Sequence, residues 1–263
     1  MACIHEAGQG VNPRPSDVDL EVTSLPREES LAVLVGHLEK RFGRTLALDD
    51  VSFSVKRKET VLLAGPNGSG KSTLLKVLTG VIRHSSHSKV EVLALDPWKS
   101  RATLFAHAAA SFEDMAFPDF MTAREYLEFV SSSRNVDVAQ ATRYAAGLFG
   151  IRSFLDEQIR TYSSGMKRKI ALAQALAFKS EMLLLDEPFV ALDTKTRKEL
   201  VDELTVRKQA GTTLIISSHV ITGLDDLVDR VMVMSNGRLV FNMIKSGSNQ
   251  SLSEMFDSAM ENA

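Results

Sequence analysis

A glycine-rich stretch of the sequence has the residue types and spacing that bind phosphate. Residues 65–72 read GPNGSGKS and match G-x-x-x-x-G-K-[ST] in full. Glycines let successive backbone N–H groups turn toward phosphate oxygens, and the start of a following helix adds a favourable dipole. We expect Lys71 to reach the β- and γ-phosphates and Ser72 to bind Mg²⁺. The nucleotide contacts expected here come from Gly65, Pro66, Asn67, Gly68, Ser69, Gly70, Lys71, Ser72 and Thr73.

An ordinary glycine turn is the competing interpretation of this stretch. At usual glycine frequencies, a chance match in a chain of this length is on the order of 1 in 100. The match therefore favours a nucleoside triphosphate site. It does not choose among kinases, GTPases and ATPases.

Two adjacent carboxylates follow a second apolar run. Residues 182–185 read MLLL, and Asp186 and Glu187 come directly after them. In open α/β sheets, ligands bind at the carboxyl ends of the strands. We expect Asp186 to hold Mg²⁺, directly or through water, and Glu187 to polarise the attacking water. An exposed acidic turn is the alternative, but the pairing with the phosphate loop favours the catalytic interpretation.

The elements needed to position these residues can be predicted from the local pattern. A β-like run over 60–64 precedes the phosphate loop, and a helix over 72–78, closed by Gly80, follows it. Short apolar runs over 182–185 and 213–217 flank a helical stretch over 194–210, which is a βαβ pattern. The Asn236-Gly237 pair predicts a hairpin within 231–241. Two further β-like segments cover 34–38 and 51–55, with Val51, Phe53 and Val55 on one face.

The remaining regions differ in character. Residues 1–30 are rich in Gly, Pro, Ser and acidic residues, so we expect a disordered extension. Capping-box spacing at Thr122–Glu125 and again at Asp137–Gln140 predicts two helices, and with them a helical insert over about 100–160. The tail, 246–263, has room for a short helix. The nucleotide-binding domain is expected over 31–245.

Composition is that of an ordinary globular protein. The net charge is −2, with 44% hydrophobic and 24% charged residues and one cysteine, Cys3. This balance gives no basic field that would favour nucleic acid, and one cysteine excludes an internal disulfide. No apolar run approaches the roughly 18–20 residues of a spanning helix. We expect a soluble, cytoplasmic chain.

The segment Tyr162-Ser163-Ser164-Gly165-Met166, followed by a helix over 167–178, resembles the signature of ABC transporter ATPase subunits. That signature usually reads Leu-Ser-Gly-Gly-Gln; this chain keeps Ser163 and Gly165, in a form similar to exporter-type members. The resemblance implies an α/β P-loop core of the ABC type, with an antiparallel β subdomain and a helical insert. It also implies that Ser163 and Gly165 act on ATP held by the opposite subunit. A plain capped helix is the alternative.

The same resemblance assigns roles to four further residues. Phe42 matches the aromatic that stacks on adenine, with a core phenylalanine as the alternative. Asp193 lies in the loop that couples the two sites of the dimer, and His219 matches the switch histidine that contacts the γ-phosphate. The family's usual Mg²⁺-binding glutamine is missing, since no glutamine occurs between Lys71 and Ala139. The equivalent position is Glu113, which we expect to bind the metal.

The function implied is ATP-binding and ATP hydrolysis, with Mg²⁺, coupled through dimer closure to transport by a separate transmembrane permease subunit. The signature segment favours export. The second ATPase subunit is an identical or a related chain, and the pair is expected on the cytoplasmic face of the membrane. The aromatic residues Phe117, Phe120 and Tyr126 are predicted to contact the permease.

Two other classes of protein could contain the same phosphate loop. An ABC ATPase acting on a ribosome or nucleic acid is the alternative, but the insert shows no sustained heptads. An unrelated kinase or GTPase would not need the Ser163–Gly165 segment, and the Asn-Lys-x-Asp guanine motif is missing. The sequence does not identify a transported substrate.

Overall fold

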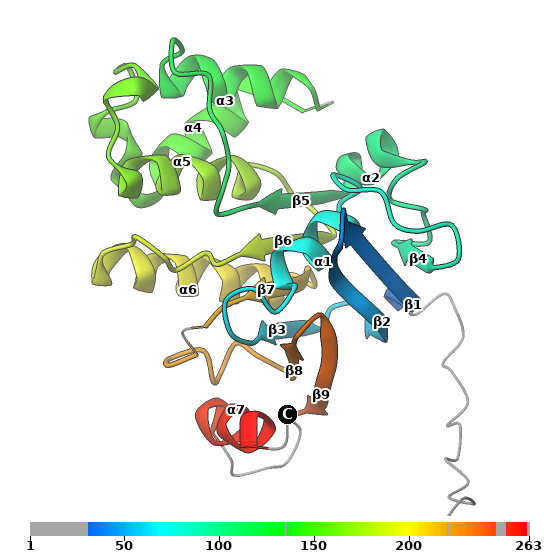
Figure 1. The fold of residues 1–263 in the computed structure, drawn as a ribbon. Coiled ribbons are helices and arrows are strands. Elements are labelled where there is room, and N and C mark those ends of the chain that lie inside the picture. Colours follow the sequence, from blue (N-terminus) through cyan, green and yellow to red (C-terminus); the bar gives the residue numbers. More distant parts are fainter. Residues whose placement is uncertain (1–30, 135, 220, 246–250, 262–263) are drawn as a thin grey trace, which may run out of the picture.

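The computed structural model describes residues 31–134, 136–219, 221–245 and 251–261. The predicted extension, 1–30, lies outside the described residues, as do 246–250 and 262–263 of the tail. The described chain forms two β-sheets and a group of helices (Figure 1). This arrangement agrees with the α/β architecture expected from the sequence.

The larger sheet has six strands in the order β5-β6-β7-β3-β8-β9. Its neighbours are parallel except for β8 and β9. The carboxyl ends of β3, β6 and β7 therefore meet at one edge of the sheet, where the phosphate loop and the two carboxylates follow. The strands are β3 (Thr60–Ala64), β5 (Ala108–Ser111), β6 (Met182–Asp186), β7 (Thr213–Ser217), β8 (Arg230–Ser235) and β9 (Arg238–Ile244).

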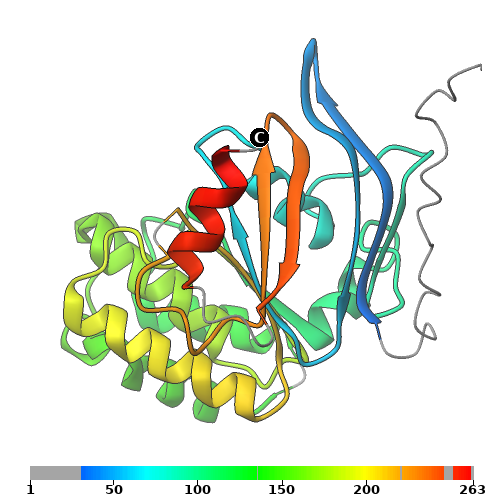
Figure 2. The ribbon, with the colours of Figure 1, turned by 90° about the horizontal axis from the view of Figure 1, so that it is seen from below.

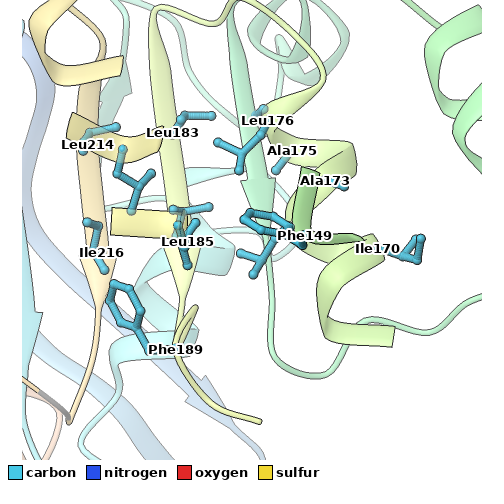
Figure 3. Close-up of a cluster of buried hydrophobic side chains, with 14 of the residues drawn as sticks. Phe149, Ile170, Ala173, Ala175, Leu176, Leu183, Leu185, Phe189, Leu214 and Ile216 are labelled. Carbon is cyan, nitrogen blue, oxygen red and sulfur yellow. The ribbon is translucent and has the colours of Figure 1, made fainter. Parts of the chain in front are cut away.

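The central strands are mostly apolar because both faces of the sheet are covered. Alternate side chains enter two separate cores. Leu183 and Leu185 of β6 join the core formed with the helical region, while Met182 and Leu184 join the core on the side of α1 (Lys71–Leu78). Figure 3 shows the first of these cores, with side chains of β6 and β7 facing those of the helical region.

The smaller sheet is antiparallel and has the order β2-β1-β4. Its strands are β1 (Leu31–Phe42), β2 (Thr45–Lys56) and β4 (Lys89–Val92). Val51, Phe53 and Val55 are buried on one face of β2, as predicted. The β1–β2 hairpin runs beside the β8–β9 hairpin (Figure 2), where the Asp49 N–H donates to the Gly237 carbonyl at 2.9 Å.

The turn of the β8–β9 hairpin follows the prediction. Asn236 has a φ of 48° and Gly237 a φ of 80°, the two positive angles that a type I′ turn requires. A Cβ atom on Gly237 would lie 2.9 Å from the Ala47 carbonyl oxygen. Glycine is thus needed at this position both for the turn and for the close approach of β2.

The helices are placed around these sheets. After α1, α2 (Arg101–His107) precedes β5, and α3 (Ala123–Ser132), α4 (Val138–Gly147) and α5 (Ser164–Leu176) gather on one side of the larger sheet (Figure 1). Two 3-10 segments, Leu148–Ser153 and Ile159–Thr161, connect α4 to α5. The chain continues through α6 (Thr194–Gln209) and ends in α7 (Leu252–Glu261).

The region predicted as a helical insert, about 100–160, contains a core strand as well. β5 lies inside this range and pairs in parallel with β6. Its sequence, Ala-Ala-Ala-Ser, has low β-propensity, so its strand conformation comes from pairing and burial. The two predicted helix starts are present: Thr122 and Glu125 form a reciprocal capping box, and the Asp137 side chain accepts from the Gln140 N–H.

Two of the aromatic residues predicted to face a permease pack against the protein's own core, Tyr126 fully and Phe117 in part. Tyr126 is buried, and the Phe117 ring meets it edge-on with centroids 5.1 Å apart. The Tyr126 hydroxyl donates to Gln174 on α5 at 3.0 Å. Only Phe120 of the three is largely exposed, at 73%. Within the described residues, no helix has both the length and the apolar character needed to cross a membrane.

Candidate active site

The phosphate loop joins β3 to α1 and depends on two of its glycines. Gly65 has a φ of 143°, and a Cβ atom there would lie 2.3 Å from the Met234 carbonyl oxygen. Gly70 has a φ of 105°, and a Cβ atom there would lie 2.7 Å from the Ala47 carbonyl oxygen. Since no larger residue fits either place, the β2 and β8 backbones close tightly around the loop. The N–H groups at the start of α1 remain available to an anion.

Lys71 lies along the inside of this loop with its side chain buried. Its ammonium donates to the carbonyl oxygens of Gly65 at 2.8 Å and Pro66 at 3.1 Å. The same nitrogen lies 3.8 Å from Oε1 of Glu187. The loop lysine and the second carboxylate, far apart in the sequence, therefore converge on one point at the edge of the sheet.

Ser217, at the end of β7, holds the two carboxylate residues in place. Its hydroxyl donates to Oδ1 of Asp186 at 2.6 Å and accepts from the Glu187 N–H at 2.9 Å. Glu187 also donates its N–H to the Ser217 carbonyl at 3.1 Å and has a positive φ of 45°. This turn directs Glu187 away from the strand axis, while Asp186 remains at the strand end with 1% of its surface exposed.

The Glu187 carboxylate has one oxygen that accepts hydrogen bonds and one buried oxygen without a hydrogen-bond partner. Oε2 accepts from Nδ1 of His219 at 2.8 Å and from the His219 N–H at 3.3 Å. Oε1 is buried and makes no hydrogen bond in the described structure. With Nδ1 donating to Glu187, the histidine presents Nε2 away from that carboxylate. An unpaired buried carboxylate oxygen is costly unless a donor such as water occupies the site.

These contacts fit a Mg²⁺–nucleotide complex. Ser69 Oγ, within the phosphate loop, is the second buried acceptor without a partner in this part of the described chain. The described residues contain no group of three or more His, Cys, Asp or Glu side chains placed to hold a metal ion by themselves. Mg²⁺ is commonly bound by one or two carboxylates together with substrate phosphates and water. Asp186 and the Ser72 hydroxyl are the residues that would hold the ion together with a triphosphate.

The signature segment lies elsewhere on the surface of the same chain. Ser163 caps α5 by accepting the Met166 N–H at 3.2 Å, and its side chain is exposed. Gly165 is close to the Ala191 backbone, since a Cβ atom there would lie 3.1 Å from the Ala191 oxygen. In the described chain, no hydrogen bond or ion pair joins Ser163 or Gly165 to the phosphate loop.

Asp193 connects α5, which starts in the signature segment and is called the signature helix below, with α6. It caps α6 by accepting from the Thr196 N–H and hydroxyl, both at 2.8 Å, and lies 3.3 Å from the Lys169 ammonium on α5. The bonds from Thr196 and then from Lys169 lower the pKa of Asp193 to about 2. The carboxylate is therefore charged throughout the physiological range.

Phe42 and Glu113 are both exposed and lie outside the converging group. Phe42 is 49% exposed at the end of β1, with the Lys40 ammonium 5.3 Å from its ring centre. This exposure is inconsistent with the core interpretation of Phe42. Glu113 lies in the loop after β5, next to Asp114, whose carboxylate pairs with Lys76 at 2.5 Å.

Sequence reasoning missed two residues at this site, Ser217 and Arg168. Ser217 could be found from its place at the end of a β-run that neighbours the carboxylate strand. Arg168 gave no such signal, because it sits in a run of three cations, Lys167 to Lys169. In the structure it is buried and donates to the carbonyl oxygens of Phe112 and Asp186.

A groove of about 1450 Å³ lies beside β5, the edge strand of the larger sheet. Residues of α2, α3, α4, α5 and α6 and of the segment between α3 and α4 line it. Its exposed apolar or aromatic side chains include Val136 in that segment, Tyr144 on α4 and Val206 on α6. Arg134 also lines it, donating to the Ala108 carbonyl at 3.1 Å with its guanidinium 4.2 Å from the Phe178 ring centre. No carboxylate of the described chain pairs with Arg134, and burial lowers its pKa.

Comparison with known proteins agrees with these features. Residues 48–190, more than half of the chain, match the family described as ABC transporter. The linearmycin resistance ATP-binding protein LnrL of Bacillus subtilis is 29% identical over 78% of this chain and 66% of its own length. The molybdate/tungstate import ATP-binding protein WtpC of Thermococcus kodakarensis is 33% identical over 80% of this chain and 64% of its own length.

Among solved structures, a dimeric ATP-binding cassette in a post-hydrolysis state with ADP and Pi bound has a TM-score of 0.73 and 22% identity. The match covers 82% of this chain and all of that one. At this identity, the similarity shows the fold. The chain belongs to the ABC transporter family and carries its ATP-binding domain. It spans slightly less than two thirds of the length of LnrL and WtpC.

Proposed function

We propose that this chain is the ATP-hydrolysing subunit of an ABC transporter and drives export through a separate transmembrane subunit. The observation that carries the proposal is the convergence of Lys71, Glu187 and His219, with a buried Glu187 oxygen left without a donor. A water bound to that oxygen would be activated by a carboxylate already held in place by histidine.

Each residue of the site has a separate role in the proposed reaction. The N–H groups of the phosphate loop and the Lys71 ammonium bind and orient the β- and γ-phosphates. Ser72 and Asp186 hold Mg²⁺, which neutralises developing charge when it is bound. Glu187 Oε1 accepts a proton from the attacking water, and His219 orients Glu187 through Oε2. Phe42, exposed at the end of β1, stacks on the adenine.

A second ATPase subunit completes the site. Ser163 and Gly165 lie at an exposed helix start, and neither bonds to the phosphate loop of its own chain. We infer that they contact the γ-phosphate held by the opposite subunit, which is either a copy of this chain or a related ATPase. Asp193, which is bonded to both α5 and α6, lies where the two sites would communicate.

The groove beside β5 is the proposed docking site for the transmembrane subunit. It joins the helical region to the core sheet and exposes apolar side chains around an arginine that has no carboxylate partner in the described chain. A cytoplasmic helix with an apolar face and one acidic residue matches that surface. With this docking site, we propose that the subunit works on the cytoplasmic face of the membrane.

Export is supported by the form of the signature segment, Tyr-Ser-Ser-Gly-Met, and by similarity to LnrL, which is named for resistance. WtpC, named for import, is of comparable similarity. Loading of a transport substrate into inverted vesicles by the assembled complex, driven by ATP, would test the direction. Accumulation in right-side-out vesicles instead would mean import.

The ATPase proposal itself is tested by phosphate release from the purified chain with and without Mg²⁺. We expect Mg²⁺-dependent turnover that Lys71→Met removes, because methionine keeps the length of the side chain and lacks its charge. Turnover that persists in Lys71→Met would contradict the proposal.

A further inference from the structure

Arg168 projects from the second turn of the signature helix into the space between the ends of β5 and β6. It is 6% exposed. Nη1 donates to the Phe112 carbonyl at 2.9 Å, and Nη2 donates to the Asp186 carbonyl. Phe112 directly follows β5 and Asp186 is the last residue of its parallel neighbour β6, so the guanidinium links the two strands where their backbone pairing stops.

The loop after β5 is held from its other side by α1. The Lys76 ammonium pairs with Asp114 at 2.5 Å and lies 5.9 Å from the centre of the Phe112 ring. Glu113 therefore sits between two anchored residues. One anchor belongs to α1, which follows the phosphate loop, and the other belongs to α5, which Ser163 caps.

The charge around Arg168 is also distinctive. No ion pair with a carboxylate is formed by Arg168 in the described chain, and its Nε is buried without a partner. Burial lowers the pKa of Arg168, while the negative charges of Asp186, Glu113 and Glu187 act in the opposite direction. The guanidinium remains charged, since arginine keeps its proton in proteins. Its positive charge thus offsets the negative charges of three carboxylates, although the guanidinium binds none of them directly.

We propose that Arg168 is a positioning residue that fixes the spacing between Glu113 and Asp186 and transmits movement of the signature helix to both. This inference rests on the proposed function, in which Asp186 holds the metal, and on the prediction that Glu113 also binds it. Arginine suits the task because two separate nitrogens reach two carbonyls. A lysine at this position would keep the positive charge but would reach only one of the two carbonyl oxygens.

The first test follows hydrogen exchange in the nucleotide-free protein. In Arg168→Met, we expect amides of 112–116 and 186–190 to exchange about tenfold to a hundredfold faster, because two charge-assisted bonds are lost. Arg168→Lys should give an intermediate rate. The matched control is Lys167→Met, which removes a more exposed cation from the same helix and should leave both segments unchanged.

The second test separates positioning from general packing. Arg168→Lys should keep KM for ATP within about twofold, because the phosphate loop is untouched, while kcat falls about tenfold or more through misplaced carboxylates. Unchanged exchange and unchanged kcat in a folded variant would overturn the proposal. If Arg168→Met does not fold, the exchange rates and kcat of Arg168→Lys are judged by the same criteria.

The two tests also separate this inference from the proposed function. Hydrogen exchange needs neither nucleotide nor metal. If wild-type protein fails to hydrolyse ATP, the proposed function is lost, while the exchange of 112–116 and 186–190 still decides whether Arg168 fixes this spacing.

Discussion

The Glu187 side chain has two features that suit a general base: a fixed position and an oxygen that accepts no hydrogen bond. One oxygen is fixed by His219 and the other is buried without a donor, 3.8 Å from the Lys71 ammonium. A carboxylate so placed is ready to accept a proton from a water bound between it and the γ-phosphate. His219, 49% exposed at its side chain, is positioned at the open side of this pair.

We predict that Glu187→Gln binds ATP and hydrolyses it about 10²–10⁴ times more slowly, because the amide cannot accept the proton. His219→Ala should also slow turnover, since Glu187 then loses its orienting partner. Phosphate release and nucleotide binding are measured together for each variant. Glu199→Gln, a carboxylate on the surface of α6, is the control. Wild-type rates in both Glu187→Gln and His219→Ala would disprove the assignment.

Glu113 gives a separate prediction about the metal. The resemblance predicts that it takes the place of the family's usual glutamine, and it lies in the loop held by Arg168 and Lys76. Glu113→Gln should keep hydrolysis, because an oxygen ligand remains. Glu113→Ala should raise the Mg²⁺ concentration for half-maximal rate by about tenfold. The measurement is the Mg²⁺ dependence of ATPase rate in both variants and wild type. Three superimposable curves would mean that Glu113 does not serve the metal.

At the scale of elements, α5 joins the parts of the site that the sequence separates. It begins at the signature, carries Arg168 in its second turn, and ends beside the groove, where Ala175 and Phe178 contribute to the lining. A helix of this length spans about 20 Å. We infer that movement at either end of α5 would be carried past the edge of the sheet at which we propose that the metal binds.

The prediction for this helix concerns dimer formation. In a Glu187→Gln background, ATP should convert the chain to a dimer in which Ser163 contacts the opposite nucleotide. Ser163→Asp keeps a good helix cap but places negative charge against the triphosphate, so dimer formation should be lost. Ser163→Asn, an equally good cap without charge, is the matched control. Light scattering with and without ATP measures whether each variant is a monomer or a dimer.

Two outcomes of this experiment have separate meanings. A Ser163→Asp protein that dimerises as well as its parent would contradict contact in trans. A parent that stays monomeric at high ATP would favour a pair formed with a related ATPase, and the same variants are then tested with that chain added.

The sequence predicted those elements whose local chemistry is distinctive. The Asn236-Gly237 turn, the Thr122–Glu125 capping box and the apolar central strands all carry a signal within a few residues. β5 does not, because Ala-Ala-Ala-Ser has no β preference and depends on its neighbour β6. Arg168 could not be singled out for the same reason: only packing decides which of three consecutive cations is buried.

At the scale of the whole molecule, the groove is surrounded by contacts that tie the helical region to the core. The Tyr144 hydroxyl on α4 donates to Glu203 on α6 at 2.6 Å. Arg207, which pairs with Glu203 at 2.7 Å, also donates to the Leu176 and Phe178 carbonyls at the end of α5. A partner bound here would therefore act on α4, α5 and α6 together.

The last prediction is that this groove binds an integral membrane protein. A photo-crosslinking amino acid at Val136 or Val206, both exposed in the groove, should capture such a protein from native membranes. The same probe at Val240 on β9, at the opposite edge of the sheet, is the control and should not. Arg134→Glu should reduce capture about tenfold or more, because it places like charge against the expected acidic residue. Capture of ribosomal proteins alone would instead favour an ABC ATPase that acts on the ribosome, and equal capture from Val240 would remove the groove as the docking site.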